Sequence, residues 1–211
     1  MTAHRRSPVR RSARARVAFL ASLVALAAAP ASAQGPPASA PWTYGTTLNV
    51  FGGAAVDSAH TGAAGGAAFG WELTRRLSFE ASATWLARGA GANGFAADFA
   101  TLFNLTPPRR LVPFVKGGLG LYRASFDPTR SPMPGFYAEG VEAADVFERH
   151  AVFTNPAVVT GGGINLWLGE HFSLRPELDL RIVTRVGGAH PIMVAAVRVA
   201  YHFEDHPLLS R

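Results

Sequence analysis

Apolar and polar residues alternate along residues 172–183, and this is the clearest pattern in the chain. Successive side chains of a β-strand point to opposite faces, so the segment predicts a strand with two different faces. The apolar face consists of Phe172, Leu174, Pro176, Leu178, Leu180 and Ile182. The polar face consists of Ser173, Arg175, Glu177, Asp179 and Arg181. In a transmembrane barrel the apolar face meets lipid and the charges point inward, whereas a soluble protein would turn its charges to water.

Seven further segments alternate in the same way, while helical periodicity is weak throughout the chain. They span residues 42–51, 65–73, 77–86, 95–105, 111–122, 158–168 and 192–203. Each is close to the roughly 9–11 residues that a tilted strand needs to cross a bilayer. Aromatic residues cluster near the segment ends, as in the interfacial girdles of membrane barrels.

The connections between these segments alternate in length. Short turns follow the second, fourth and sixth predicted strands, and longer, more variable loops are expected after the first, third, fifth and seventh. Bacterial barrels combine short periplasmic turns with longer external loops in this way. The sequence therefore predicts an all-β fold, an eight-stranded antiparallel transmembrane up-and-down β-barrel over residues 42–203.

The polar face of the predicted barrel carries charges of both signs. The expected interior charge network is Glu72, Glu80, Asp98, Lys116, Arg175, Glu177, Asp179, Arg181 and Arg198. Opposite charges can pair inside a narrow barrel, which offsets the cost of removing them from water. An eight-stranded barrel is just wide enough for side chains to fill, so we expect a plugged lumen and no wide aqueous pore.

Pro176 lies in the middle of a predicted strand, where its missing N–H cannot join the ladder. A β-bulge and a register that leaves this donor unused both fit the sequence.

The net charge of +6 is concentrated at the N-terminus. Six arginines lie within the first 16 residues, and the first 33 residues contain no Asp or Glu. The remaining chain is formally neutral, so nucleic-acid binding is not predicted. The arginine-rich start, the apolar run 17–29 and the small residues at 31–33 predict a secretory signal peptide over 1–33. That run is too short to span a bilayer as a helix. Residues 34–41 form a Pro/Ala-rich lead-in to the barrel.

The chain contains no cysteine, which excludes disulfides and thiolate metal sites. Gly161-Gly162-Gly163 precedes more strand rather than a helix, so it does not predict a nucleotide site. We therefore predict no cofactor and no metal.

Several stretches, taken in order, resemble a known family. These are residues 71–80 around a tight turn, the Gly-rich stretch 113–120, and 161–166 followed by 172–179. The chain resembles the eight-stranded outer-membrane barrels that include outer-membrane protein A-like domains and opacity adhesins. The resemblance implies a monomer in the bacterial outer membrane, in contact with lipid and lipopolysaccharide and assembled by periplasmic chaperones and the barrel-insertion machinery. The family usually ends on an aromatic residue, whereas here the tail 204–211 follows Phe203. An insertion signal within the chain and weaker recognition by the insertion machinery both fit this difference from the family.

His171 and Ser173 form a His-x-Ser pair similar to that of outer-membrane lipid A deacylases. Such an enzyme needs a serine activated by a histidine and a carboxylate to orient the histidine. The position that the resemblance gives to the acid is occupied by Arg185, and Glu177 lies on the barrel wall. We therefore predict no enzyme, with a membrane-embedded lipid A hydrolase as the alternative.

The longest predicted loop spans residues 123–152 and is the first candidate for recognition outside the cell. Its candidate contact residues are Phe126, Asp127, Phe136, Tyr137, Glu142 and Glu148. Its acidic residues match no compact calcium loop. The sequence thus predicts a structural or surface-interaction protein, and a soluble periplasmic ligand-binding barrel is a further alternative.

Overall fold

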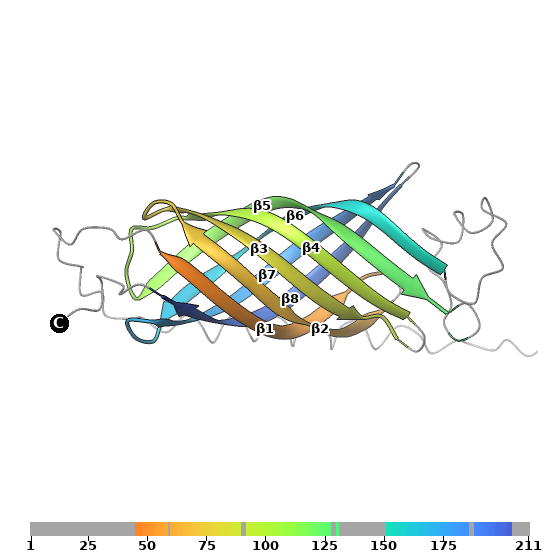
Figure 1. Ribbon diagram of the computed structural model, residues 1–211, viewed down its shortest axis with the longest axis horizontal. Helices are drawn as coiled ribbons and strands as arrows, with labels where there is room; N and C mark the ends of the chain where they lie inside the picture. The colour runs from red at the N-terminus through yellow and green to blue at the C-terminus, as the bar shows by residue number, and fades with distance from the viewer. Residues whose placement is uncertain are drawn as a thin grey trace, which may run out of the picture. The chain divides into compact units, whose positions relative to one another are not determined.

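The computed structural model describes residues 45–58, 60–89, 92–127, 130, 151–185 and 188–203. Its strands are β1 (Thr46–Val56), β2 (Thr61–Glu72), β3 (Leu77–Ala87), β4 (Ala92–Asn104), β5 (Leu111–Phe126), β6 (Ala151–Trp167), β7 (Phe172–Arg185) and β8 (Gly188–His202). Each strand pairs antiparallel with its sequence neighbours, and β1 also pairs with β8, which closes the barrel (Figure 1). The predicted fold class and the eight strands are confirmed.

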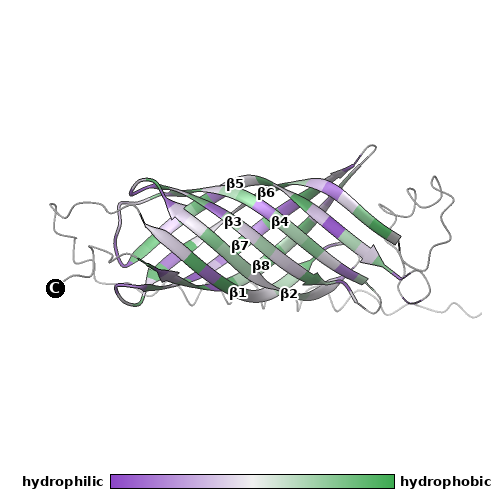
Figure 2. Ribbon diagram, in the orientation of Figure 1, coloured by the Kyte–Doolittle hydropathy of each residue, from purple (hydrophilic) through white to green (hydrophobic). Residues whose placement is uncertain are grey.

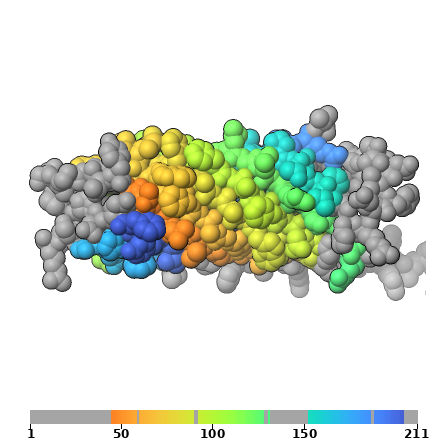
Figure 3. All heavy atoms as spheres, viewed as in Figure 1, coloured from red at the N-terminus to blue at the C-terminus, as the bar shows by residue number. Residues whose placement is uncertain are grey.

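Hydrophobic and hydrophilic residues alternate along the strands (Figure 2), and burial shows that they face opposite sides of the wall. On β5, Leu119 is 69% exposed while Lys116 is 7% exposed. Large apolar side chains are exposed on the outer face of every strand, where a soluble protein would present polar groups. Leucines and aromatics that point outward from a closed barrel match a lipid-facing wall. On the face shown in Figure 3, the side chains of neighbouring strands form a continuous surface.

The two ends of the barrel differ in their connections. We call the end with the turns 73–76, 105–110 and 168–171 the turn side; it lies at the left in Figure 1. The opposite end, the loop side, carries the connections 57–60, 88–91, 127–150 and 186–187.

The expectation of four long loops on the loop side was wrong, because only 127–150 is long there. The strands continue past the length expected for crossing a bilayer, so Gly- and Ala-rich residues such as 52–56 and 61–64 pair in the ladder. Strands β5 and β6 extend furthest, with 16 and 17 residues.

Pro176 leaves a gap in hydrogen bonding rather than a bulge. The β6–β7 ladder pairs Gly163 with Glu177 and resumes at Leu166 with Leu174, in the same register. On the other side, Pro176 keeps its pairing position opposite Val197 of β8. Of the two explanations that the sequence left open, the one without a bulge holds.

No helix among the described residues is long and apolar enough to cross a membrane.

Candidate functional site

Glu177 is the centre of a buried charge cluster in the turn-side half of the lumen. Its Oε1 lies 3.2 Å from Lys116 Nζ and also accepts from Arg198 Nε. Its Oε2 lies 3.3 Å from Arg175 Nε. One carboxylate therefore faces three cations, and it is held by strand β7, whose alternating pattern directs it inward.

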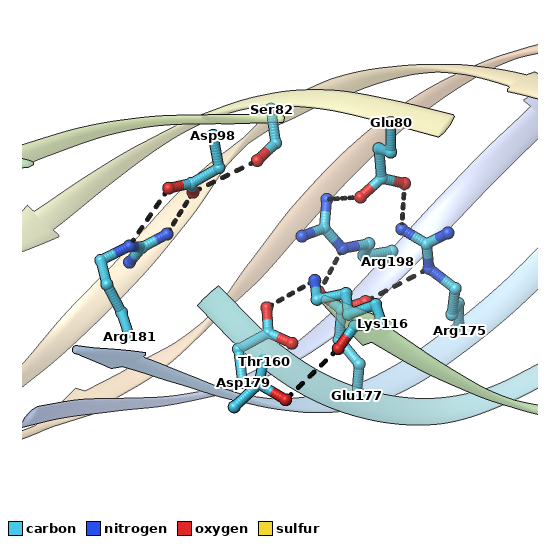
Figure 4. Close-up of polar contacts among 10 residues, drawn as sticks. All are labelled: Glu80, Ser82, Asp98, Lys116, Thr160, Arg175, Glu177, Asp179, Arg181 and Arg198. Atoms are coloured by element: carbon cyan, nitrogen blue, oxygen red, sulfur yellow. Dashed lines mark hydrogen bonds and ion pairs between the residues drawn. The ribbon is translucent and has the colours of Figure 1, made fainter. Parts of the chain in front are cut away.

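Glu80 and Asp179 complete this cluster from either side. Glu80 pairs with Arg175 and lies 3.7 Å from Arg198 NH1. Asp179 Oδ2 lies 2.6 Å from Lys116 Nζ. The ion pairs connect β3, β5, β7 and β8 across the lumen (Figure 4). Such cross-barrel pairs offset the desolvation of charges that are all buried.

Asp98 and Arg181 form a second ion pair one layer closer to the loop side, and Ser82 Oγ donates to Asp98 at 3.4 Å (Figure 4). The structure thus brings eight of the nine predicted interior residues into two neighbouring groups. The ninth, Glu72, lies at the end of β2 and instead approaches His202.

Glycines and aromatic rings shape the space around the charges. A Cβ at Gly120 would overlap the Asp98 carboxylate, and one at Gly161 would overlap Asp179. The Arg198 guanidinium lies 3.9 Å from the centre of the Phe51 ring. Cation–π contact of this kind satisfies a buried cation without a further acid.

The loop-side half of the lumen is filled by an apolar cluster that the sequence analysis did not identify. Its bulky members are fully or almost fully buried: Leu86, Tyr122, Phe126, Val183 and Ile192. These residues occupy inward-facing positions toward the loop-side ends of their strands. Extending the alternating pattern of the predicted strands to those ends would have identified them.

A polar cap closes this half at the loop side. Asp57 pairs with Arg88, and its Oδ2 lies 3.0 Å from His190 Nε2. Arg88 NH2 also lies 3.4 Å from His190 Nε2. Asp57 follows the end of β1, so strand periodicity alone gave no signal for it.

Ser173 contacts a different histidine from the one expected. Its Oγ lies 3.0 Å from Nε2 of His202, whose Nδ1 lies 3.5 Å from Glu72 Oε1. His171 Nδ1 lies 3.0 Å from the His202 carbonyl oxygen, and its ring stacks on outward-facing Tyr201. These contacts connect β7, β8 and the end of β2 at the turn-side mouth of the barrel.

A cavity of about 40 Å³ opens beside these residues and is lined by Glu72, Trp167, Ser173 and His202 among others. Cavities that bind drug-sized ligands measure roughly 300 Å³ or more, so this one has room for water only. Among the described residues, no three His, Asp or Glu side chains group as metal ligands.

The candidate recognition residues were partly misplaced. Phe126 is 2% exposed and packs against Phe153 inside the lumen, at 6.4 Å between ring centres. Because β5 continues to this residue, Phe126 falls in phase with inward-facing Tyr122. Asp127 directly follows the strand, and its carbonyl accepts from Arg130 N at 3.1 Å. Phe136, Tyr137, Glu142 and Glu148 lie outside the described residues.

Comparison with known proteins supports the fold. No protein-family model and no curated protein matches the chain. The N-terminal β-barrel domain of OprF from Pseudomonas aeruginosa matches with a TM-score of 0.55 and 15% identity, covering 75% of this chain and 97% of that one. Neisserial surface protein A matches with a TM-score of 0.55 and 12% identity, over 76% and 97% of the two chains.

The outer membrane enzyme PagL is also similar, with a TM-score of 0.45 and 14% identity over 73% of this chain and 97% of that one. These likenesses concern fold and carry no activity across. The chain is a closed eight-stranded barrel that resembles Gram-negative outer-membrane proteins, and its lipid-facing wall suits it to that membrane.

Proposed function

We propose that this outer-membrane barrel is a rigid, non-conducting scaffold that presents the loop 127–150 for surface interaction. The observation that supports this most strongly is the filled lumen, in which buried ion pairs and an apolar cluster lie one above the other. A lumen of this kind leaves no path for solutes. It instead holds all eight strands against one another.

The stem below the loop supports a role in presentation. Strands β5 and β6 are the longest in the barrel, and Phe126 packs against Phe153 at their loop-side ends. The Arg185 guanidinium lies 5.6 Å from the centre of the Phe153 ring, which braces this hairpin against β7. Recognition loops are commonly carried on rigid scaffolds of this sort. The partner class is lipopolysaccharide or another envelope or host surface molecule.

The test replaces residues 131–147 with a short Gly-Ser linker in the full chain. Binding to purified lipopolysaccharide and to intact cells is compared with the parent, while heat-modifiable gel migration reports the folded barrel. We expect the shortened variant to fold and to lose binding. A matched control, Glu170→Gln on the turn side, should bind like the parent. If the shortened variant also binds like the parent, the loop is not the recognition element.

The plug itself is testable by reconstitution in planar bilayers. We expect no stable open conductance from the parent. Sustained conductance comparable to that of a water-filled porin would contradict the proposed closed lumen.

The proposal includes export and maturation. Signal cleavage after Ala33 predicts a mature chain that begins at Gln34, which intact mass of the membrane-extracted protein checks. Recovery in the soluble periplasm would instead favour a soluble ligand-binding barrel. A soluble barrel would present polar groups on its outer face, whereas large apolar groups such as Leu119 and Phe99 cover that face.

A second candidate, an ester hydrolase, is favoured by the Ser173–His202–Glu72 contacts, which have the order of a nucleophile, a base and an orienting acid. Ser173 is only 1% exposed and faces the lumen near the turn side, away from lipid A in the external leaflet. We therefore expect no labelling by a serine-reactive fluorophosphonate. Labelling that disappears in Ser173→Ala would establish the hydrolase instead.

A further inference from the structure

Two neighbouring turns on the turn side carry four arginines and no acid. Turn 73–76 contains Arg75 and Arg76, and turn 105–110 contains Arg109 and Arg110. All four are exposed. The third turn, 168–171, carries Glu170 and no arginine. The positive charge is therefore concentrated on one sector of the rim, which we call the arginine rim (Arg75, Arg76, Arg109 and Arg110).

Hydrogen bonds hold the two turns together. Asn104 donates from its backbone N to the Arg76 carbonyl at 2.8 Å and from Nδ2 to the Arg75 carbonyl at 3.2 Å. Thr74 Oγ1 accepts from Arg76 N at 3.2 Å, which fixes the first turn. Arg109 Nε donates to the Leu111 carbonyl at 3.0 Å, which anchors the guanidinium through one nitrogen and leaves its two NH2 groups outside this bond. The backbone of turn 73–76 is therefore tied to the start of turn 105–110, which keeps the four arginines on one part of the rim.

Apolar side chains beside the arginines set their depth in the membrane. Trp71, Leu73, Phe103 and Leu105 are exposed next to the two turns. Aromatic residues of barrels gather at the membrane–water interface, and long cationic side chains extend from there into the headgroup layer. Guanidinium groups at this depth meet lipid phosphates, which they bind through paired N–H donors.

We propose that the arginine rim is a binding site for the phosphate headgroups of anionic phospholipids in the turn-side leaflet. It would recruit lipids such as phosphatidylglycerol to one sector of the barrel circumference. The inference concerns the end of the barrel opposite the recognition loop, and it stands if that loop binds nothing.

The test measures which lipid surrounds each tryptophan. One chain keeps only Trp71, on the turn side, and another keeps only Trp85, near the loop side; the other tryptophans are changed to Phe. Both are reconstituted in phosphatidylcholine vesicles with a minority of phosphatidylglycerol, and either lipid is supplied with brominated chains as the quencher. One arginine near a charged surface contributes about 1 kcal/mol, which corresponds to roughly a fivefold preference for the headgroup that it meets. We expect a preference for phosphatidylglycerol of at least this size at Trp71 and a smaller one at Trp85, where Arg123 is the nearest exposed arginine across the ladder.

The Trp71-only chain is then compared with its variant Arg75→Gln, Arg76→Gln, Arg109→Gln, Arg110→Gln. The preference should disappear in the variant and weaken in high salt. Arg123→Gln, an exposed arginine of β5 away from the turn side, is the matched control and should leave it unchanged. Heat-modifiable migration verifies folding of each variant. An equal preference for phosphatidylglycerol in the parent and the quadruple variant would overturn the proposal. Binding of both proteins to purified cell-wall sacculi is measured in parallel. If the quadruple variant loses this binding while its quenching is unchanged, the rim binds cell-wall carboxylates instead of lipid.

Discussion

The lumen of this barrel is divided into two halves that are filled by different chemistry. Toward the turn side, Glu177 and its partners form a dense set of ion pairs; toward the loop side, Leu86, Tyr122 and Ile192 form a buried apolar cluster. Both halves are built from inward positions of the same strands. Alternation therefore determines which residues enter the lumen, while the size and charge of those residues determine how each half is filled.

The two halves should fail in different ways when a side chain is removed. In the charged half, loss of one partner leaves the others buried without compensation. In the apolar half, loss of atoms leaves a cavity whose cost grows with its volume. A second substitution at a neighbouring site should recover part of the lost stability in the charged half and increase the loss in the apolar half.

The largest effect is expected for Glu177→Gln. The substitution keeps the shape of the side chain but leaves Lys116, Arg175 and Arg198 with one carboxylate fewer. We expect the free energy of unfolding to fall by about 3–5 kcal/mol. Denaturant titration of the barrel in detergent micelles, followed by heat-modifiable migration, measures the change.

Two further variants make this result diagnostic. Adding Arg198→Met to Glu177→Gln should recover part of the loss, because one uncompensated cation is removed while Glu80 keeps Arg175 as its partner. Glu170→Gln, at an exposed turn position, should change the unfolding free energy by less than about 0.5 kcal/mol. If the two glutamates give equal losses, the charge cluster does not stabilise the barrel.

The next effect is expected in the apolar half. Leu86 is fully buried, so Leu86→Ala should cost about 3 kcal/mol through lost contacts and a residual cavity. Adding Ile192→Ala should increase the loss, in contrast to the recovery expected in the charged half. The same denaturant titration measures both variants. Recovery in this pair would erase the distinction between the halves.

The strand count, the closure and the inward face were predictable because strand alternation has a fixed period of two. Once Arg175, Glu177 and Arg181 were placed inward on β7, each inward charge of β3 and β5 became a candidate partner. The particular pairs were not predictable, because they depend on register and on how far each side chain reaches across the lumen. Arg175 reaches Glu80, which is far away in sequence.

The strand ends and the apolar cluster were missed for a related reason. Gly- and Ala-rich stretches give a weak alternating signal, so residues 52–56 were interpreted as loop although they pair in the ladder. Stopping the fifth strand at Tyr122 likewise assigned Phe126 to a surface loop. The contact of Ser173 with His202 joins strands β7 and β8, and local spacing favoured His171 instead.

A smaller effect on the free energy of unfolding tests whether the close packing of strands in the barrel wall tolerates an added methyl group. Gly118 and Gly117 are adjacent on β5 but face opposite sides of the wall. A Cβ at Gly118 would overlap the Phe99 carbonyl and Ala100 of β4, whereas a Cβ at Gly117 has open space. We expect Gly118→Ala to cost about 1–3 kcal/mol and Gly117→Ala to be neutral or slightly stabilising in the same titration. Equal values would mean that the wall relaxes to accept the methyl group.

The smallest effect is expected for Tyr122→Phe, which separates the chemistry of the apolar half from its volume. The Tyr122 hydroxyl is buried and has no hydrogen-bond partner among the described residues. Removing a buried hydroxyl without a partner leaves no group unsatisfied, so Tyr122→Phe should lie within about 0.5 kcal/mol of the parent or be more stable. Tyr122→Ala, by contrast, should cost as much as Leu86→Ala or more, because it empties the ring volume. A loss above about 1.5 kcal/mol for the Phe variant would mean that the hydroxyl is hydrogen-bonded in the folded barrel and that the apolar cluster contains a polar contact besides the cap.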